Sequence, residues 1–159
     1  MKNKLHAFYQ QVNLPEWIVP IILLGVSFAA FGIFAPKMGF YMDDWHFVYY
    51  AYTRGVESLS NVLFYDSRPF GGWIYQLGFN MLGFKPVIWH ITSLVLRAMT
   101  AIFFWLLFRS IWDHQKKYSF YISILFLVYP FFLLQPMSVA YSIHWVGFLF
   151  YALSLWLMI

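Results

Sequence analysis

A long run without charge occupies the last quarter of this chain. From Tyr118 to Ile159 the sequence contains no Asp, Glu, Lys or Arg over 42 residues. Soluble domains carry roughly 25% charged residues, whereas only 10% of this chain is charged and 62% is hydrophobic. Such a chain cannot cover a water-facing surface, so we predict an integral membrane protein. Because the run ends without a polar flank, we also expect the chain to be the N-terminal part of a longer protein.

Four stretches are apolar enough to be considered as membrane crossings. The first contains twenty uncharged residues, and the second would form a helix about 34 Å long, enough for a hydrocarbon core of about 30 Å. The prediction is an all-α polytopic transmembrane helix bundle that forms a single domain over residues 1–159. Its expected spans are about 17–36, 86–108, 118–135 and 143–159.

The distribution of basic residues predicts the orientation. Lys2 and Lys4 precede the first span, and Arg109, Lys116 and Lys117 follow the second. If all five lie on the cytoplasmic side, as the positive-inside rule favours, then residues 37–85 form one long outer loop. The N-terminus is then cytoplasmic, in what we expect to be a bacterial plasma membrane. The first apolar run continues to Phe34, which favours an uncleaved anchor over a signal peptide.

Two helices are expected within this outer loop, both lying in the membrane interface. Residues 43–54 have two faces at helical spacing, an aromatic one with Trp45 and Tyr49 and a polar one with His46 and Arg54. Residues 69–84 would form a helix of about 24 Å, too short for a comfortable crossing. Asp66 or Ser67 is its expected N-cap.

Two adjacent carboxylates open the outer loop. Asp43 and Asp44 would repel each other near a region of low dielectric, so one of them is expected to have a raised pKa, as suits a general base. The alternative is structural: Asp43 caps the interfacial helix and Asp44 favours its N-terminal dipole. The two interpretations are compatible.

Three basic side chains are candidates for a binding site. Arg97 lies at the midpoint of the second span, where a charge must face protein or water. With His90 it shares a polar stripe that should line the bundle interior, in either a structural or a functional role. Arg68 begins the second loop helix, where a guanidinium suits phosphate, although it could instead reach lipid headgroups.

Several chemistries are not indicated by the sequence. The chain has no Cys, and its histidines lack the spacing of metal ligands. There is no Gly-rich phosphate loop and no serine nucleophile elbow. Basic residues are dispersed, so we expect no nucleic-acid partner.

The order of these features resembles the N-terminal module of GT-C glycosyltransferases. That family includes the protein O-mannosyltransferases and the bacterial aminoarabinose transferase. The matching motifs are short but occur in the same order along most of the chain. They are Asp43-Asp44, Ser67-Arg-Pro-Phe70, Gly83-Phe-Lys-Pro86, Trp89-His90 and the region of Pro130.

The resemblance implies an inverting transferase of the cell envelope. Such enzymes pass a sugar from a polyprenyl-phosphate donor to an acceptor hydroxyl at the outer membrane face. By position, Asp43 resembles the catalytic base and Asp44 its acidic neighbour. Arg68, with His90 and Arg97, would serve the donor phosphate and lipid. We expect no cofactor, with a requirement for a divalent cation left open.

Two other functions fit the same composition. The chain could be a transporter or flippase-like bundle with Arg97 and His90 on the substrate path, which discontinuous spans would favour. It could also be a membrane subunit without chemistry of its own.

Overall fold

All regular secondary structure in the described part of the chain is helical. The computed structural model describes residues 15–65, 68–112, 114, 116–129 and 135–159. The helical fold class is therefore confirmed. The α-helices are α2 (Ile18–Ser27), α3 (Asp44–Arg54), α4 (Ser58–Tyr65), α5 (Pro69–Leu82), α6 (Pro86–Ile111), α7 (Lys116–Val128) and α8 (Ser142–Leu157).

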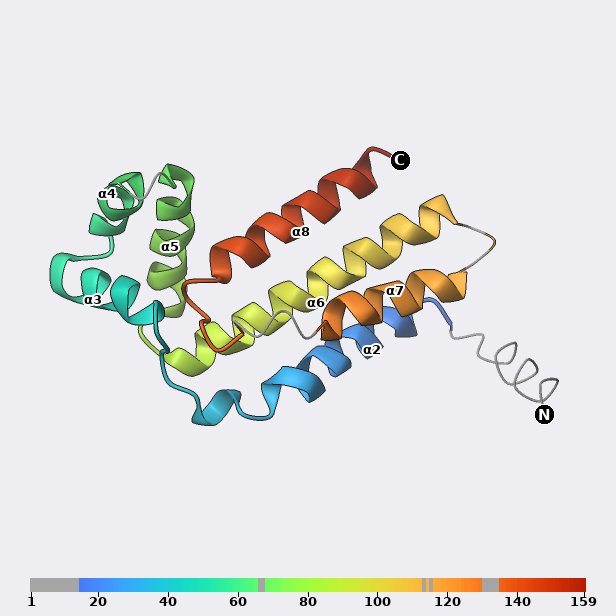
Figure 1. The fold of residues 1–159 in the computed structure, drawn as a ribbon, viewed down its shortest axis with the longest axis horizontal. Helices are drawn as coiled ribbons and strands as arrows, with labels where there is room; N and C mark the ends of the chain where they lie inside the picture. The colour runs from blue at the N-terminus through green and yellow to red at the C-terminus, as the bar shows by residue number, and fades with distance from the viewer. Residues whose placement is uncertain (1–14, 66–67, 113, 115, 130–134) are drawn as a thin grey trace.

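Four helices lie side by side, and three gather at one end. In Figure 1, α2, α6, α7 and α8 share one general direction, while α3, α4 and α5 group beyond the end where α6 begins. The α6 helix packs against α2, α7 and α8, so it is the centre of the bundle. We refer to α3, α4 and α5 together as the cap.

Within the described part of the chain, two segments are long and apolar enough to cross a membrane. One is Ile18–Lys37, where α2 continues through a π-helical turn, Phe28–Gly32, and a short 3-10 turn, Ala35–Lys37. The other is Pro86–Ile111, the 26-residue helix α6. Both coincide with expected spans. They indicate membrane association by length and composition.

The other two expected spans are shorter as helices. The α7 helix has 13 residues and α8 has 16, which correspond to about 20 Å and 24 Å. Neither reaches the length of a complete crossing on its own. Residues 130–134, which include the expected break at Pro130, lie outside the described part of the chain.

The segment expected to form the outer loop, residues 37–85, contains one more helix than predicted. The first predicted loop helix is present as α3 and the second as α5, but α4 lies between them. The sequence did not predict α4, because its 8 residues, SLSNVLFY, are too few to show a clear helical period. Gly55 at φ 82° ends α3, and Gly83 at φ 64° ends α5, a backbone conformation that glycine adopts without strain.

Two apolar clusters hold the molecule together. The first joins the cap to the start of α6 and to the segment before α8, and it includes Phe47, Leu59, Tyr75 and Trp89. The second lies within the bundle, where α2, α6 and α7 meet around Leu23, Trp105 and Leu127. The cap is thus packed onto the bundle rather than attached as a loose loop.

The basic end of the bundle lies opposite the cap. Glu16, just before α2, forms ion pairs with Arg109 at the end of α6 and with Lys116 at the start of α7. These contacts bring the start of α2, the end of α6 and the start of α7 to one end. Arg109 and Lys116 were predicted to lie on the same side of a membrane, and the structure places both at this end of the bundle. Lys2 and Lys4 lie outside the described residues.

Candidate functional site

Asp44 is fully buried and binds backbone groups from a distant part of the chain. Its Oδ1 accepts hydrogen bonds from the N–H groups of Val139 at 2.9 Å and Ala140 at 2.8 Å, and its Oδ2 accepts one from Ser138 at 3.0 Å. The backbone N–H of Tyr41 lies 3.4 Å from Oδ2. Asp44 therefore holds the segment before α8 against the cap.

The environment of Asp44 affects its pKa in two opposing ways. Burial raises the pKa because it disfavours the charged carboxylate, and this effect is the larger. The hydrogen bonds from Ala140, Tyr41, Val139 and Ser138 lower it. A raised pKa was expected for one of the two aspartates. The buried position, however, makes Asp44 a positioning residue that cannot reach a substrate in this conformation.

Asp43 has the opposite environment. It occupies the N-cap position of α3, yet its side chain makes no capping hydrogen bond, and it is exposed. The expected capping role is therefore absent. The preceding residue, Met42, has φ 44°, a left-handed conformation that non-glycine residues seldom adopt. The two adjacent aspartates thus differ, because Asp44 is buried and Asp43 is exposed.

Arg68 lies at the N-cap position of α5, with its side chain exposed. Its backbone carbonyl accepts a hydrogen bond from the N–H of Gly71 at 2.9 Å, and its own N–H donates to the carbonyl of Leu63 at 2.8 Å. The guanidinium thus begins α5, as expected. The proposed caps Asp66 and Ser67 lie outside the described residues.

Tyr75 is a buried phenol whose pKa is affected by both exposed charges, Asp43 and Arg68. Its buried hydroxyl donates to the carbonyl of Ala140 at 2.7 Å. Burial raises the pKa of this phenol, the positive charge of Arg68 lowers it, and the carboxylates of Asp44 and Asp43 raise it. All three charges therefore lie near one phenol, although Asp43 and Arg68 are far apart in the sequence.

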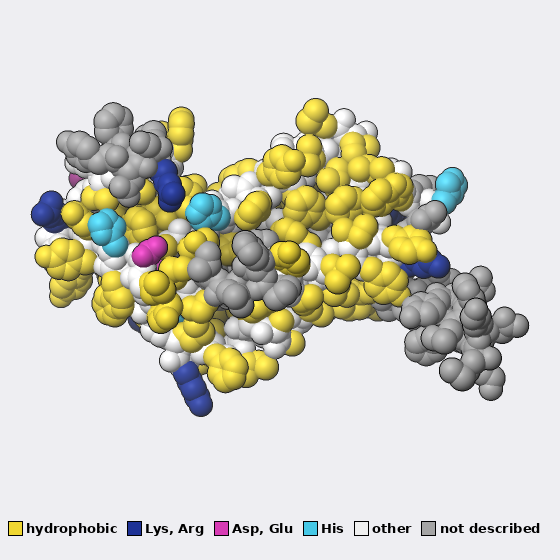
Figure 2. Space-filling view, viewed as in Figure 1, with side chains coloured by type: hydrophobic (Ala, Val, Ile, Leu, Met, Phe, Trp, Pro, Cys, Tyr) yellow, Lys and Arg dark blue, Asp and Glu magenta, His cyan; other side chains and the backbone are white. Residues whose placement is uncertain are grey.

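The start of α5 lies close to the start of α8. A Cβ at Gly71 would lie 2.6 Å from the Cδ1 atom at the end of the Ile143 side chain, so the two helices approach closely at this point. The contact brings Arg68 into electrostatic interaction with the exposed His144. Figure 2 shows acidic, basic and histidine side chains gathered on the surface at this cap end. His144 thus belongs to the candidate site, and the sequence did not predict this.

His90 and Arg97 lie inside the bundle. Nε2 of His90 is 3.1 Å from the carbonyl oxygen of Gly39. Nε of Arg97 donates to the carbonyl of Leu127 at 2.9 Å, and its Nη1 donates to Oε1 of Gln135 at 3.1 Å. These contacts join α6 to α7 and to the segments that flank the cap, which favours structural roles for both side chains.

The predicted polar stripe on α6 is present and buried. It contains His90, Ser93, Arg97 and Thr100, each at most 2% exposed. Ser93 donates to the carbonyl of Ser138 at 3.0 Å, and the Arg97 guanidinium lies 3.8 Å from the ring centroid of Phe31. An arginine at the middle of an apolar helix thereby faces protein rather than lipid.

No group of three His, Cys, Asp or Glu side chains that could hold a metal ion occurs in the described part of the chain. The arrangement at the cap end can instead accept a proton at Asp43 and bind an anion at Arg68 and His144.

Searches against protein-family models, curated proteins and solved structures find no match to this chain.

Proposed function

We propose that the cap end binds the head of a polyprenyl-phosphate sugar and that the chain is the donor-binding module of a GT-C-type glycosyltransferase. The single observation that carries this proposal is that Asp43 and Arg68, which are both exposed, act electrostatically on the same buried phenol, Tyr75. A carboxylate and a guanidinium, both exposed, can serve an acceptor hydroxyl and a donor phosphate at once. The proposal also draws on the motif order described above.

In this proposal, Asp43 and Arg68 each have one role. The Asp43 carboxylate takes the proton of the acceptor hydroxyl as its oxygen attacks the anomeric carbon. The bond from that carbon to the phosphate oxygen breaks, and the configuration inverts. Arg68 stabilises the negative charge that remains on the departing polyprenyl phosphate. Asp44 takes no part in proton transfer, since it holds the segment before α8 in place.

The exposed surface of the cap supports a position at the membrane interface. Trp45, Tyr49 and Tyr52 are exposed along α3, and Trp73 is exposed on α5. Tyr and Trp side chains concentrate at membrane–water boundaries, because their rings are apolar and their polar atoms reach water. We place the cap at the outer face, where a lipid-linked donor presents its head group.

The first test is binding of polyprenyl phosphate to the purified chain. Arg68→Gln should weaken binding about tenfold, because one charge-assisted contact is lost. Arg54→Gln is the matched control, since Arg54 is also exposed in the cap but lies over the Tyr50 ring. Equal affinities for the two variants would contradict the proposed phosphate contact.

The second test is sugar transfer from polyprenyl-phosphate mannose to a hydroxyl acceptor in membranes that contain the protein. Asp43→Asn should lower turnover by about 10²- to 10⁴-fold and leave donor binding intact. Glu57→Gln, at an exposed carboxylate between α3 and α4, should keep full turnover. Retained turnover in Asp43→Asn would exclude Asp43 as the base.

A further inference from the structure

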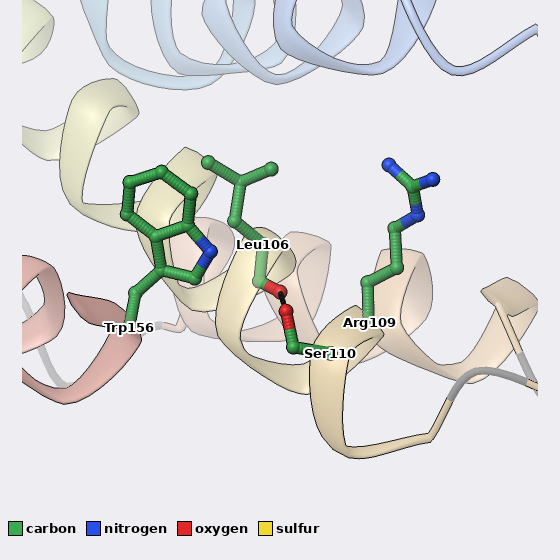
Figure 3. A pocket seen from close by; sticks show the side chains of 4 residues that line it. All are labelled: Leu106, Arg109, Ser110 and Trp156. Carbon is green, nitrogen blue, oxygen red and sulfur yellow. Dashed lines mark hydrogen bonds between the residues drawn. The ribbon is translucent and has the colours of Figure 1, made fainter. Parts of the chain in front are cut away.

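A cavity lies at the end of the bundle opposite the cap. It has a volume of about 470 Å³ and is lined by Leu106, Arg109 and Ser110 of α6 and by Trp156 of α8 (Figure 3). The two helices pack against each other, and both approach their C-terminal ends here. No residue of the proposed glycosyltransferase site belongs to this cavity, so a separate function must be considered for it.

The cavity has an apolar wall and a polar wall. Trp156 is positioned by a ring contact with Phe103, with centroids 5.7 Å apart. In Figure 3 the indole lies on one side, Arg109 lies on the other, and Leu106 and Ser110 lie between them. The Ser110 hydroxyl donates to the carbonyl of Leu106 at 3.0 Å. An indole and a leucine suit glycerol and acyl carbons, whereas a guanidinium suits a phosphate.

Charge around the cavity favours an anionic ligand. The guanidinium of Arg109 lies 5.6 Å from the Trp105 ring centroid and pairs with Glu16. Lys116 shares the same carboxylate at 2.9 Å, and Lys117 follows directly. Three basic side chains and one acidic side chain leave a net positive charge. The C-termini of α6 and α8 carry partial negative charge, so attraction of an anion depends on the basic side chains.

The surroundings identify the source of the anion as a lipid. Exposed apolar side chains follow the lining residues in the sequence, namely Ile111 and Trp112 at the end of α6 and Leu157 and Met158 at the end of α8. Basic pockets between apolar helices at the cytoplasmic boundary suit anionic lipid head groups. We propose that this cavity binds the phosphate of an anionic phospholipid, with Arg109 as the main contact and Trp156 against the glycerol region.

The test measures lipid binding by native mass spectrometry of the purified chain in mild detergent. Phosphatidylglycerol and phosphatidylcholine are the two probes. The chain should bind phosphatidylglycerol several-fold more tightly, and Arg109→Gln should weaken that binding about tenfold, as expected for one lost charge-assisted contact. Arg54→Gln, at the cap end, should bind both lipids as the parent chain does.

A second variant separates lipid binding from a purely structural ion pair. Glu16→Gln breaks the same ion pair as Arg109→Gln but leaves the guanidinium available. If Arg109 binds lipid, Glu16→Gln should bind more phosphatidylglycerol than the parent chain. If the pair only supports the fold, both variants should lose binding together, and that result would overturn the proposal.

Three further outcomes would overturn the proposal. Displacement of phosphatidylglycerol by inorganic phosphate would show a site for soluble anions and would overturn the assignment to lipid. Equal phosphatidylglycerol binding by Arg109→Gln and Arg54→Gln would overturn it as well. Should Arg109→Gln fail to fold, Trp156→Ala removes the apolar wall instead and should weaken phosphatidylglycerol binding. Unchanged binding in Trp156→Ala would likewise exclude the site.

Discussion

The Oδ1 atom of Asp44 lies 2.9 Å from the backbone nitrogen of Val139, across 95 residues of sequence. This hydrogen bond and its neighbours at Ser138 and Ala140 connect the start of the cap to the segment before α8. They place His144 beside Arg68 and give Tyr75 its acceptor at Ala140. The position of the candidate site therefore depends on one buried carboxylate.

Removal of this carboxylate should destabilise the fold. Asp44→Ala leaves the N–H groups of Ser138, Val139 and Ala140 buried without their acceptor, at a cost of about 3 kcal/mol in the free energy of unfolding. Asp44→Asn keeps one acceptor oxygen and should lose less. Thermal unfolding in detergent measures both variants. Asp43→Asn, at the exposed neighbour, should change stability by less than about 0.5 kcal/mol. Equal melting temperatures for Asp44→Ala and Asp43→Asn would contradict the structural role of Asp44.

The raised pKa of Asp44 gives a pH dependence with a definite sign. Because burial raises the folded-state pKa above the ordinary value of 3.8, the folded state holds this proton to higher pH than the unfolded state. The contribution to stability is complete below pH 3.8 and is lost as the pH rises through the folded-state pKa. Melting temperatures of the parent chain and Asp44→Asn from pH 3 to 7 isolate this effect. The stability of the parent chain relative to Asp44→Asn should decline as the pH rises from 3 to 7. An increase over this range would contradict a raised pKa for Asp44.

Replacement of Arg97 should weaken the bundle strongly. Arg97→Gln removes the bond to the Leu127 carbonyl and the contact with Gln135, with a loss of about 3 kcal/mol or more. Arg97→Lys should recover little, since an ammonium lacks the planar fork that reaches both acceptors. Thermal unfolding is again the measurement. In the control Arg54→Gln, an exposed cation–π contact is lost, and the cost should stay below about 1 kcal/mol. Full stability in Arg97→Lys would show that charge alone is needed.

Two glycines form a matched pair for testing the packing of the cap. A Cβ at Gly78 of α5 would lie 2.4 Å from the Cη2 atom of Trp89, on a rigid ring. Gly78→Ala should therefore cost about 1–3 kcal/mol. Gly147 of α8 has no atom within 4 Å of its ideal Cβ, so Gly147→Ala should stabilise the helix by up to about 1 kcal/mol. Equal effects of the two changes on the melting temperature would argue against this contact between α5 and α6.

Helical class, the two long apolar segments and the inward stripe of α6 could be predicted from the sequence. Each depends on residues close together in the chain. The apolar length near Ile18 and Pro86 is a local property, and so is the spacing that places His90 and Arg97 on one face. Hydrophobicity and helical period determine such features whatever the rest of the chain does.

Only the tertiary structure could decide the roles of the two aspartates. They are adjacent and identical in type, but Asp43 is exposed and Asp44 is buried, and the partners of Asp44 lie 94 to 96 residues away. The same applies to Arg68 and His144, which interact electrostatically because the start of α5 packs close to Ile143 of α8. Contacts of this kind depend on the folding of distant segments around one another, which no local pattern of residues encodes.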